Sequence, residues 1–188
     1  MQIEQTAIPG VLIFTPERYG DDRGFFAETW NRRQLADAGV DVEFVQDNHS
    51  VSAAAGTLRG LHMQTPPFAQ DKLVRCGRGR FLDVAVDIRV GSPTFGRWVG
   101  VELSAENGKQ TFLPHGILHG VLTLEPDTEV IYKVSNYFAP DCSRAVRFDD
   151  PEIGIEWGLS GQPILSSKDA AAPLLRDLDN PFTLETIS

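Results

Sequence analysis

Short stretches with a two-residue hydrophobic period constrain this chain more than any other feature. In Arg80–Arg89, every second side chain from Leu82 onward is apolar. Glu129–Val134 repeats the pattern, and there Tyr132 shares one face with a valine on either side. Because side chains alternate across a strand, each stretch predicts a β-strand with a buried face. We therefore expect Tyr132 to point inward.

Shorter strand candidates follow one another along the chain at the spacing of about 8–12 residues that is typical of sandwiches and barrels. The 17 Gly and 12 Pro residues are scattered between them as turn signals. An all-β chain must hide its sheet edges, which it can do by closing into a jelly roll or by pairing edges across a dimer. The candidates are Val11–Phe14, Phe44–Gln46, Lys72–Cys76, Trp98–Leu103, Gln110–Leu113 and Ala145–Phe148.

Few helices are expected. One is predicted near Arg32–Ala38, where Asn31 can cap the start and Gly39 can end it. A second is predicted in part of Ala170–Leu178, where Pro173 limits its extent. At 188 residues the chain is expected to be one domain, residues 1–188, with an N-terminal strand arm over about residues 1–50 and a C-terminal helical tail over about residues 165–188.

The charge balance excludes some classes of partner. The chain carries 17 Lys and Arg against 26 Asp and Glu, a formal net charge of −9, without a basic block. Such a balance argues against nucleic-acid binding, although a few local Arg residues can still hold a small anion. No apolar run is long enough for a membrane span, and no signal peptide is visible. Cys76 and Cys142 lack disulfide or metal spacing, so a cytoplasmic location is expected.

The segment Leu58–Gln64 and the residues after it form the densest chemical cluster. Arg59, His62 and Lys72 occur there together. Arg can grip phosphate oxygens, His can act as a base near neutral pH, and Lys can stabilise a developing oxyanion. The alternative interpretation is a polar loop between strands that carries a hydrogen-bonded His.

A second segment, Leu113–Gly120, contains the pattern Pro-x-Gly-x-x-His, whose final residue is His119. This pattern resembles the second conserved motif of the cupins. The first metal-binding motif of that superfamily is missing, because His62 stands alone, so no metal is expected. The alternative is a simple turn at Pro114 and Gly116, which is compatible with His119 facing the interior.

Three further groups carry little information when taken singly. Tyr132 could be a core tyrosine, and Lys168-Asp169 could be a surface pair or a helix cap. The stretches Asp21–Trp30 and Phe44–Ser50 place aromatic rings beside polar side chains, which could hold a nucleobase. The alternative for the first of them is a surface hairpin with two aromatic side chains in the core.

These segments belong to a series of motifs whose order along the chain matches that of one protein family. The chain resembles the dTDP-4-dehydrorhamnose 3,5-epimerases, a metal-free branch of the cupins, from about Ile3 to about Leu178. The resemblance implies an all-β cupin-type jelly roll with a few short peripheral helices. The motifs are Asp21–Phe26, Phe44–Ser50, Leu58–His62, Lys72–Cys76, Asp83–Arg89, Gly91–Gly96, Leu103–Asn107, Tyr132-Lys133 and Asp150–Trp157.

The family resemblance implies a reaction and a set of catalytic residues. The reaction converts dTDP-4-dehydro-6-deoxy-D-glucose to dTDP-4-dehydro-L-rhamnose by exchanging the protons at C3 and C5, without a cofactor. His62 would be the base and Asp169 would orient its ring. Tyr132 would return the proton on the other face, and Lys72 would stabilise the enolate oxygen.

The resemblance also implies substrate contacts and a partner. Arg59 would grip the diphosphate, with Arg23 reaching over from a second subunit of a homodimer that shares the site. The remaining substrate-binding residues would be Phe26, Glu28, Gln46, Asp47, Asn48, His119 and Lys168.

Three departures from the family pattern bear on which carbons react. Met63 and Phe138 stand where the family commonly has Tyr, and Ile117-Leu118 replaces Phe-Ala. Epimerisation at C3 alone, or a 3,4-ketoisomerase, is therefore an alternative, although Tyr132 favours an epimerase. A non-catalytic sugar-binding jelly roll and a metal-dependent cupin oxygenase are the alternatives from other classes.

Overall fold

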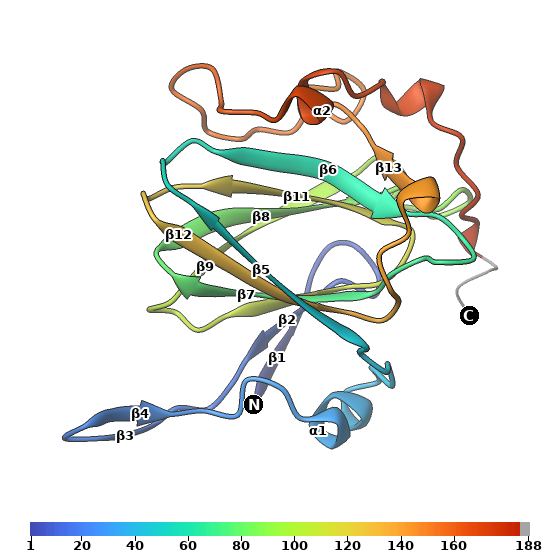
Figure 1. The fold of residues 1–188 in the computed structure, drawn as a ribbon. Coiled ribbons are helices and arrows are strands. Elements are labelled where there is room, and N and C mark those ends of the chain that lie inside the picture. The colour runs from blue at the N-terminus through green and yellow to red at the C-terminus, as the bar shows by residue number, and fades with distance from the viewer. Residues whose placement is uncertain (185–188) are drawn as a thin grey trace.

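The computed structural model describes residues 1–184 and is built almost entirely of antiparallel strands (Figure 1). One sheet has six strands in the order β1-β2-β10-β7-β12-β5, and a second has five in the order β13-β6-β11-β8-β9. The strands of the first sheet are β1 (Gln2–Gln5), β2 (Leu12–Thr15), β10 (Gln110–Leu113), β7 (Lys72–Arg78), β12 (Thr128–Val134) and β5 (Gln46–Ser52). Those of the second are β13 (Ser143–Ala145), β6 (Leu58–Gln64), β11 (Ile117–Thr123), β8 (Arg80–Asp87) and β9 (Trp98–Ser104).

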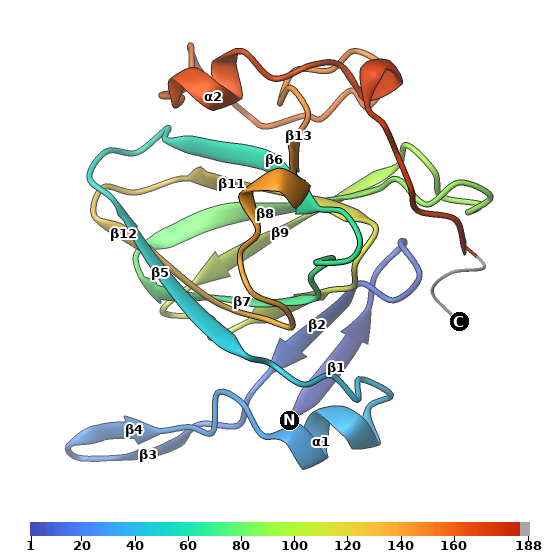
Figure 2. The ribbon, with the colours of Figure 1, turned by 45° about the vertical axis from the view of Figure 1, so that its right-hand side comes forward.

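The two sheets lie face to face, as Figures 1 and 2 show from two directions. Strands that are neighbours in space are often distant in sequence, such as β10 beside β2 and β11 beside β6. This antiparallel sandwich with long crossover connections is a jelly roll. The predicted fold class is confirmed.

The five-stranded sheet is buried on both faces. The apolar side chains on the two faces of β8 therefore pack into two different clusters. One face packs on the segment that follows β13, with Val84, Ile153 and Trp157 in one cluster. The other face meets the six-stranded sheet, with Phe81 and Val74 in a second cluster. Burial from both sides holds the strands of this sheet in a fixed frame.

The helix α1 (Arg32–Asp37) covers the outer face of the six-stranded sheet through Leu35. The side chain of Asn31 caps it by accepting from the backbone N–H groups of Arg33 and Gln34, and Gly39 follows with a φ of +86°. The helix predicted here is confirmed. Its cap satisfies donors that would otherwise lack a partner.

The second helix was predicted in the wrong place. The helix α2 (Ser167–Ala170) ends where the prediction began, and only a 3-10 turn, η2 (Leu175–Asp177), lies within Ala170–Leu178. The cap at Ser166 starts α2 early, and Pro173 cannot donate the bond that would continue it. The final residues of the expected C-terminal tail, 185–188, lie outside the described residues.

The N-terminal arm projects from the sandwich. A two-stranded hairpin, β3 (Tyr19–Asp21) with β4 (Gly24–Phe26), extends away from both sheets (Figure 1). The predicted surface hairpin is therefore present, but Phe25 and Phe26 are exposed rather than in the core. A further 3-10 turn, η1 (Pro140–Cys142), precedes β13.

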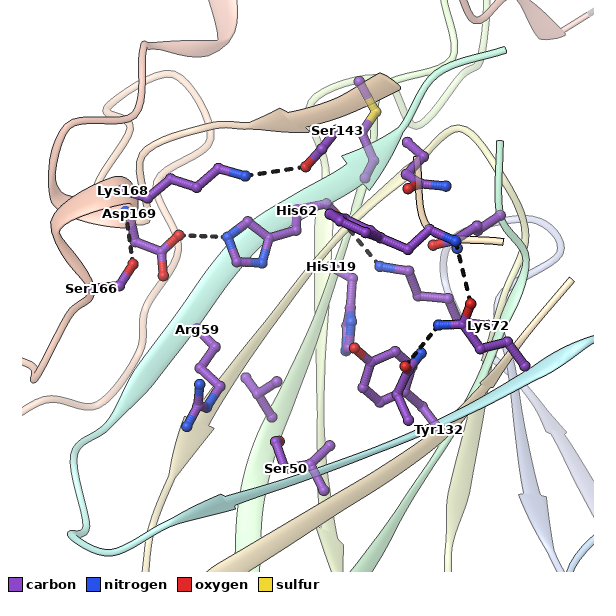
Figure 3. A pocket seen from close by; sticks show the side chains of 18 residues that line it. Ser50, Arg59, His62, Lys72, His119, Tyr132, Ser143, Ser166, Lys168 and Asp169 are labelled. Carbon is purple, nitrogen blue, oxygen red and sulfur yellow. Dashed lines mark hydrogen bonds and ion pairs between the residues drawn. The ribbon is translucent and has the colours of Figure 1, made fainter. Parts of the chain in front are cut away.

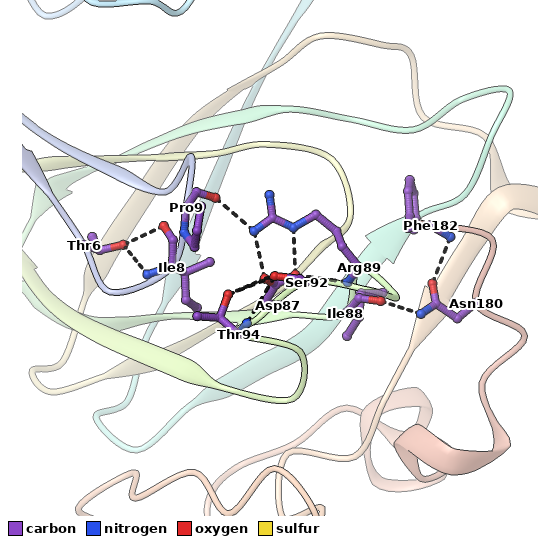
Figure 4. A network of polar contacts seen from close by, with 10 residues as sticks. All are labelled: Thr6, Ile8, Pro9, Asp87, Ile88, Arg89, Ser92, Thr94, Asn180 and Phe182. Atoms are coloured by element: carbon purple, nitrogen blue, oxygen red, sulfur yellow. Dashed lines mark hydrogen bonds and ion pairs between the residues drawn. The ribbon is translucent and has the colours of Figure 1, made fainter. Parts of the chain in front are cut away.

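Polar contacts at the end of β8 bind both the N-terminal and the C-terminal segment of the described chain (Figure 4). The carboxylate of Asp87 accepts two bonds from the guanidinium of Arg89, at 2.7 and 2.8 Å, and Arg89 also donates to the carbonyl of Pro9. On the C-terminal side, the amide of Asn180 donates to Ile88 O and accepts from Phe182 N. These contacts fix the arm and the tail relative to the sandwich.

Candidate active site

One pocket opens between the two sheets and holds most of the residues that the sequence singled out (Figure 3). Its volume is about 400 Å³. Strands β5, β7 and β12 form one side, and β6, β11, β13 and α2 form the other. The lining residues are Gln46, Asn48, Ser50, Arg59, His62, Met63, Gln64, Gln70, Lys72, His119, Val121, Val130, Tyr132, Phe138, Ser143, Ser166, Lys168 and Asp169.

His62, on β6, is paired with Asp169 of α2. The distance from His62 Nε2 to Asp169 Oδ1 is 2.5 Å. A carboxylate at this nitrogen favours the tautomer with its proton on Nε2, which leaves Nδ1 with a free electron pair. The arrangement can accept a proton at Nδ1 and stabilise the resulting imidazolium.

The backbone of α2 places Asp169 at this distance. Ser166 Oγ accepts from the backbone N–H of Asp169 at 3.1 Å, so the carboxylate stands in a capped first turn. Burial would raise the pKa of Asp169, but its hydrogen bond to His62 and the charge of that ring outweigh the effect, and the pKa is lowered. Asp169 therefore stays charged near neutral pH.

Tyr132 enters the pocket from β12, on the sheet opposite to His62 (Figure 3). The inward direction predicted from the two-residue period is confirmed, because its neighbours Val130 and Val134 are buried on the same face. Burial raises the pKa of Tyr132, while the charge of Arg59 partly opposes the shift. The phenol therefore keeps its proton at neutral pH and can donate it.

Lys72 is a buried cation at the start of β7. Its side chain donates to the backbone carbonyl of His62 at 3.5 Å. Burial lowers the pKa of Lys72 to about 8, and the negative charge of Asp83 works against this shift. An ammonium group in such a dry site interacts strongly with any negative charge that develops nearby.

His119 lies beside His62 in the sheet and is paired with a carboxylate of its own. Its Nε2 is 2.6 Å from Oδ1 of Asp83, whose other oxygen accepts from Thr111 on the opposite sheet. Burial lowers the pKa of His119, and Asp83 opposes the effect. The predicted turn at Pro114–Gly116 and the inward direction of His119 are both confirmed.

The remaining polar side chains of the pocket lie around His62 and Tyr132. Arg59 donates to Ser52 Oγ and to the carbonyl of Val51. Lys168 donates to Ser143 Oγ at 3.2 Å on the same side of the pocket, as Figure 3 shows. On β5, Gln46 and Asn48 face inward and are joined by a hydrogen bond of 2.8 Å.

Four of the expected substrate-binding residues lie outside this pocket. Arg23 and Phe26 are on the projecting hairpin, where Arg23 pairs with Asp21. Glu28 bonds to Asn31 and Gln34 beside α1. Asp47 points to the outer side of β5 and pairs with Lys133 at 2.9 Å.

Sequence reasoning missed Asp83, although a signal was present. It stands on the face of Arg80–Arg89 where Phe81 and Ala85 are buried, and a carboxylate at an inward position of a strand needs a partner.

One alternative interpretation of the segment Leu58–Gln64 was a polar loop. This interpretation is wrong, because the segment is strand β6. The register of β6 on β11 shifts between the pairs His62–His119 and Arg59–Val121, which leaves one extra residue in β6 and lets both Arg59 and His62 reach the pocket.

Among residues 1–184, no three His, Cys, Asp or Glu side chains come together as a metal site. Over the same range, no helix is long and apolar enough to cross a membrane.

The fold and the pocket define a class of protein: a jelly roll whose pocket holds a His–Asp pair on one side and a tyrosine on the opposite sheet. The family model described as dTDP-4-dehydrorhamnose 3,5-epimerase matches residues 5–177. The chain belongs to this family of isomerases.

Individual relatives agree with this assignment. The dTDP-4-dehydrorhamnose 3,5-epimerase of Salmonella typhimurium is 53% identical over 176 residues, which cover 93% of this chain and 96% of the relative. A Legionella pneumophila epimerase solved with dTDP-4-keto-L-rhamnose superposes with a TM-score of 0.91 at 45% identity, covering 95% of this chain and 94% of the other. A 3'-monoepimerase from Streptomyces bikiniensis, solved with dTDP-quinovose, has a TM-score of 0.85 at 38% identity, covering 91% and 86%.

Proposed function

We propose that the protein converts dTDP-4-dehydro-6-deoxy-D-glucose to dTDP-4-dehydro-L-rhamnose by inverting C3 and C5. The observation that carries the proposal is the placement of two groups of complementary chemistry on opposite sheets. His62, with Asp169 at its back, can take a proton, and Tyr132 can give one from the other side of the pocket. Inversion of a carbon requires the proton to leave one face and return to the other.

The first step is removal of a proton next to the ketone. Nδ1 of His62 takes the proton from C3 or C5, and the electron pair of the broken C–H bond moves toward C4. The C4 oxygen then carries the negative charge of an enolate. The ammonium group of Lys72 stabilises this oxygen in a water-poor pocket.

The second step returns a proton to the opposite face. Tyr132 donates its phenolic proton to the carbon, which restores the ketone and inverts the centre. The imidazolium then releases its proton and the phenolate recovers one, both by way of solvent. No redox change occurs in the sequence, so the reaction balances without a cofactor.

The nucleotide part of the substrate meets the outer residues of the site. Arg59 and Lys168 are exposed cations that can bind the diphosphate, and Gln46 and Asn48 offer amide groups. We also propose that a second copy of the chain supplies Arg23, Phe26 and Glu28, with Asp47 near the same contact. In support, the hairpin that carries Arg23 and Phe26 extends away from both sheets (Figure 2). The side chains of Phe25 and Phe26 on it are exposed.

We propose a cytoplasmic location. Cys76 and Cys142 are free thiols, which a reducing compartment maintains. Cell fractionation tests this assignment, and recovery of the protein outside the cytoplasm would contradict it.

Incubation with dTDP-4-dehydro-6-deoxy-D-glucose in D2O tests the proposed reaction. Nuclear magnetic resonance of the product should show deuterium at both C3 and C5 and the L-rhamno configuration. The substrate kept in D2O without protein is the control. Deuterium at C3 alone would establish a single-site epimerase instead, and the absence of exchange at either carbon would refute catalysis.

A further inference from the structure

The ammonium group of Lys72 has little hydrogen bonding of its own to hold it in the pocket. Within residues 1–184, its one hydrogen bond is to the carbonyl of His62 on the opposite sheet (Figure 3). That bond is 3.5 Å long, which is at the limit for a hydrogen bond. The place of the ammonium group therefore depends on the packing around the side chain and on how firmly the backbone at Lys72 is fixed.

The backbone at Lys72 lies where three neighbouring strands end together. Lys72 is the first residue of β7, and its pairing partners are Leu113, the last residue of β10, and Val134, the last residue of β12. A chain opens locally most readily where few hydrogen bonds hold it, as at the end of a strand. Contacts beyond the strand pairing are needed to keep Lys72 in one place.

The side chain of Asp71 supplies such contacts. Its Oδ1 accepts from the backbone N–H of His115 and lies 2.9 Å from Nδ1 of the same residue. Its Oδ2 accepts from Oγ of Ser135 at 2.9 Å. His115 follows β10 by two positions, and Ser135 follows β12 by one. One carboxylate thus joins the ends of both strands that flank β7.

The backbone of Asp71 strengthens the connection to β12. Its N–H donates to Ser135 Oγ at 2.8 Å, and its carbonyl accepts from the backbone N–H of Ser135 at 3.0 Å. Asp71 and Ser135 therefore share three hydrogen bonds directly before Lys72. We call the connection of Asp71 with His115 and Ser135 the strand-end network.

The carboxylate of Asp71 is charged and largely shielded from water. Its side chain is 16% exposed. Burial raises the pKa of Asp71, but the hydrogen bonds from His115 and Ser135 outweigh this effect, and the pKa is lowered. Hydrogen bonds to a charged acceptor are about twice as strong as those between neutral groups. The strand-end network is therefore well suited to fix the backbone before Lys72.

The strand-end network lies outside the pocket of His62. Asp71, His115 and Ser135 do not line that pocket, whereas Lys72 does. An effect of the network on the reaction must therefore pass along the chain to a residue that faces the substrate. Lys72 is the charged residue next to it.

We infer that Asp71 is a positioning residue: through His115 and Ser135 it fixes the backbone of Lys72, so that the ammonium group stands where the enolate oxygen forms. This inference rests on the proposed function. Misplacing a catalytic group by about 1 Å can lower a rate by about 100-fold. Because the enolate charge develops only during the reaction, loss of the network should lower kcat and leave KM nearly unchanged.

A double-substitution cycle with Lys72 tests this path. In the D2O assay, Asp71→Ala should lower kcat for exchange at both carbons by about 10–100-fold, with KM within about twofold of the wild-type value. Lys72→Met, which removes the ammonium group, should lower kcat by about 10²–10³-fold. The double variant should be no slower than Lys72→Met alone, because the position of a missing charge no longer matters. Circular dichroism measures the folded fraction, and kcat is expressed per folded protein.

Ser135→Ala keeps the test decisive where Asp71→Ala does not fold. It removes one oxygen atom and the two hydrogen bonds of that atom to Asp71, so it is expected to fold. It should lower kcat by a smaller factor than Asp71→Ala. Combined with Lys72→Met, it should cause no further loss.

Asn107→Ala is the matched control. The Asn107 side chain also accepts from the backbone at strand ends, from the N–H groups of Ser104 and Lys109. These residues lie at the other end of β10, away from Lys72. Asn107→Ala should therefore leave kcat and KM unchanged.

The outcomes separate this inference from the proposed function. If the wild-type protein exchanges at neither carbon, the proposed function fails. If it exchanges at both, the inference is wrong when folded Asp71→Ala keeps the wild-type kcat, or when its loss multiplies that of Lys72→Met in the double variant. Where Lys72→Met shows no exchange at all, a raised KM with unchanged kcat in Asp71→Ala or Ser135→Ala overturns the inference.

Discussion

The Nε2 atom of His62 lies 2.5 Å from Oδ1 of Asp169, although the two residues are 107 positions apart in the chain. His62 stands on a strand of the sandwich and Asp169 on a four-residue helix that packs over that strand (Figure 3). The pair leaves Nδ1 available to take a proton. Asp169 is 4% exposed, so water competes little for its charge.

Asp169→Asn should nearly abolish catalysis without unfolding the protein. The amide keeps the shape of the side chain but cannot stabilise the imidazolium, so exchange should fall by roughly 10²–10⁴-fold. Deuterium incorporation in single-turnover experiments measures the loss. Asp149→Asn, at a surface carboxylate paired with Arg147, is the control and should retain full exchange. Wild-type exchange in Asp169→Asn would show that the pair does not act in the reaction.

The rate should fall on the alkaline side near pH 8. Burial lowers the pKa of Lys72 from the usual value of 10.5 to about 8. Below that pH the side chain is charged and can stabilise the enolate; as the pH rises through 8, the charge and its effect are lost. The pH profile of kcat/KM reports this ionisation in the free enzyme. Lys72→Arg, which stays charged in this range, should lack the alkaline decline. An unchanged decline in that variant would assign it to another group.

Asp83→Asn should move the alkaline decline to lower pH. The negative charge of Asp83 raises the pKa of Lys72 and so offsets part of the effect of burial. Without that charge, less opposes the effect of burial on the pKa of Lys72, and the single amide oxygen can replace one of the two carboxylate oxygens that bond to Thr111 and His119. The pH profile of kcat/KM for Asp83→Asn, beside that for the surface control Asp127→Asn, measures the shift. A decline that stays in place in Asp83→Asn would contradict the coupling.

Gly60→Ala should destabilise the fold at the strand that carries His62. Gly60 has a φ of +130°, and an added Cβ would lie 2.7 Å from both Gly120 Cα and His119 O. Backbone atoms cannot move aside as a flexible side chain can, so we expect a loss of about 2–4 kcal/mol in the free energy of unfolding. Urea denaturation measures it. Gly161→Ala, where nothing lies within 4 Å, should change stability by less than about 0.5 kcal/mol. Equal stabilities would show that the sheet accommodates the methyl group.

Local patterns predicted the parts of the fold that depend on neighbouring residues. The bounds of Gln110–Leu113 were predicted as observed, and the helix after Asn31 followed from its cap. The inward direction of Tyr132 followed from the two-residue period because both neighbours on its face are buried.

Strand β6 was not predicted from the two-residue period, because its apolar and polar side chains do not alternate. Arg59 and His62 both reach the pocket although they are three positions apart, which a regular strand would not allow. The explanation is a bulge that involves a partner strand about 60 residues away in sequence, and no local pattern reports it.

Long-range pairing also decided the chemistry of the site. Nothing near Asp169 in the sequence indicates that it meets His62; only the family resemblance implied it. Asp83 looked like one member of an alternating strand, and its partners come from β10 and β11. The pocket is assembled by the crossing of distant strands, which periodicity cannot describe.

The exchange activity of His62→Ala tests the central claim most directly. Wild-type protein and variant are incubated in D2O with dTDP-4-dehydro-6-deoxy-D-glucose, and deuterium at C3 and C5 is followed by nuclear magnetic resonance, with circular dichroism as a check on folding. We predict that the wild-type protein labels both carbons and that folded His62→Ala labels neither above the protein-free rate. Labelling of either carbon by His62→Ala at the wild-type rate would contradict the assignment of His62 as the base.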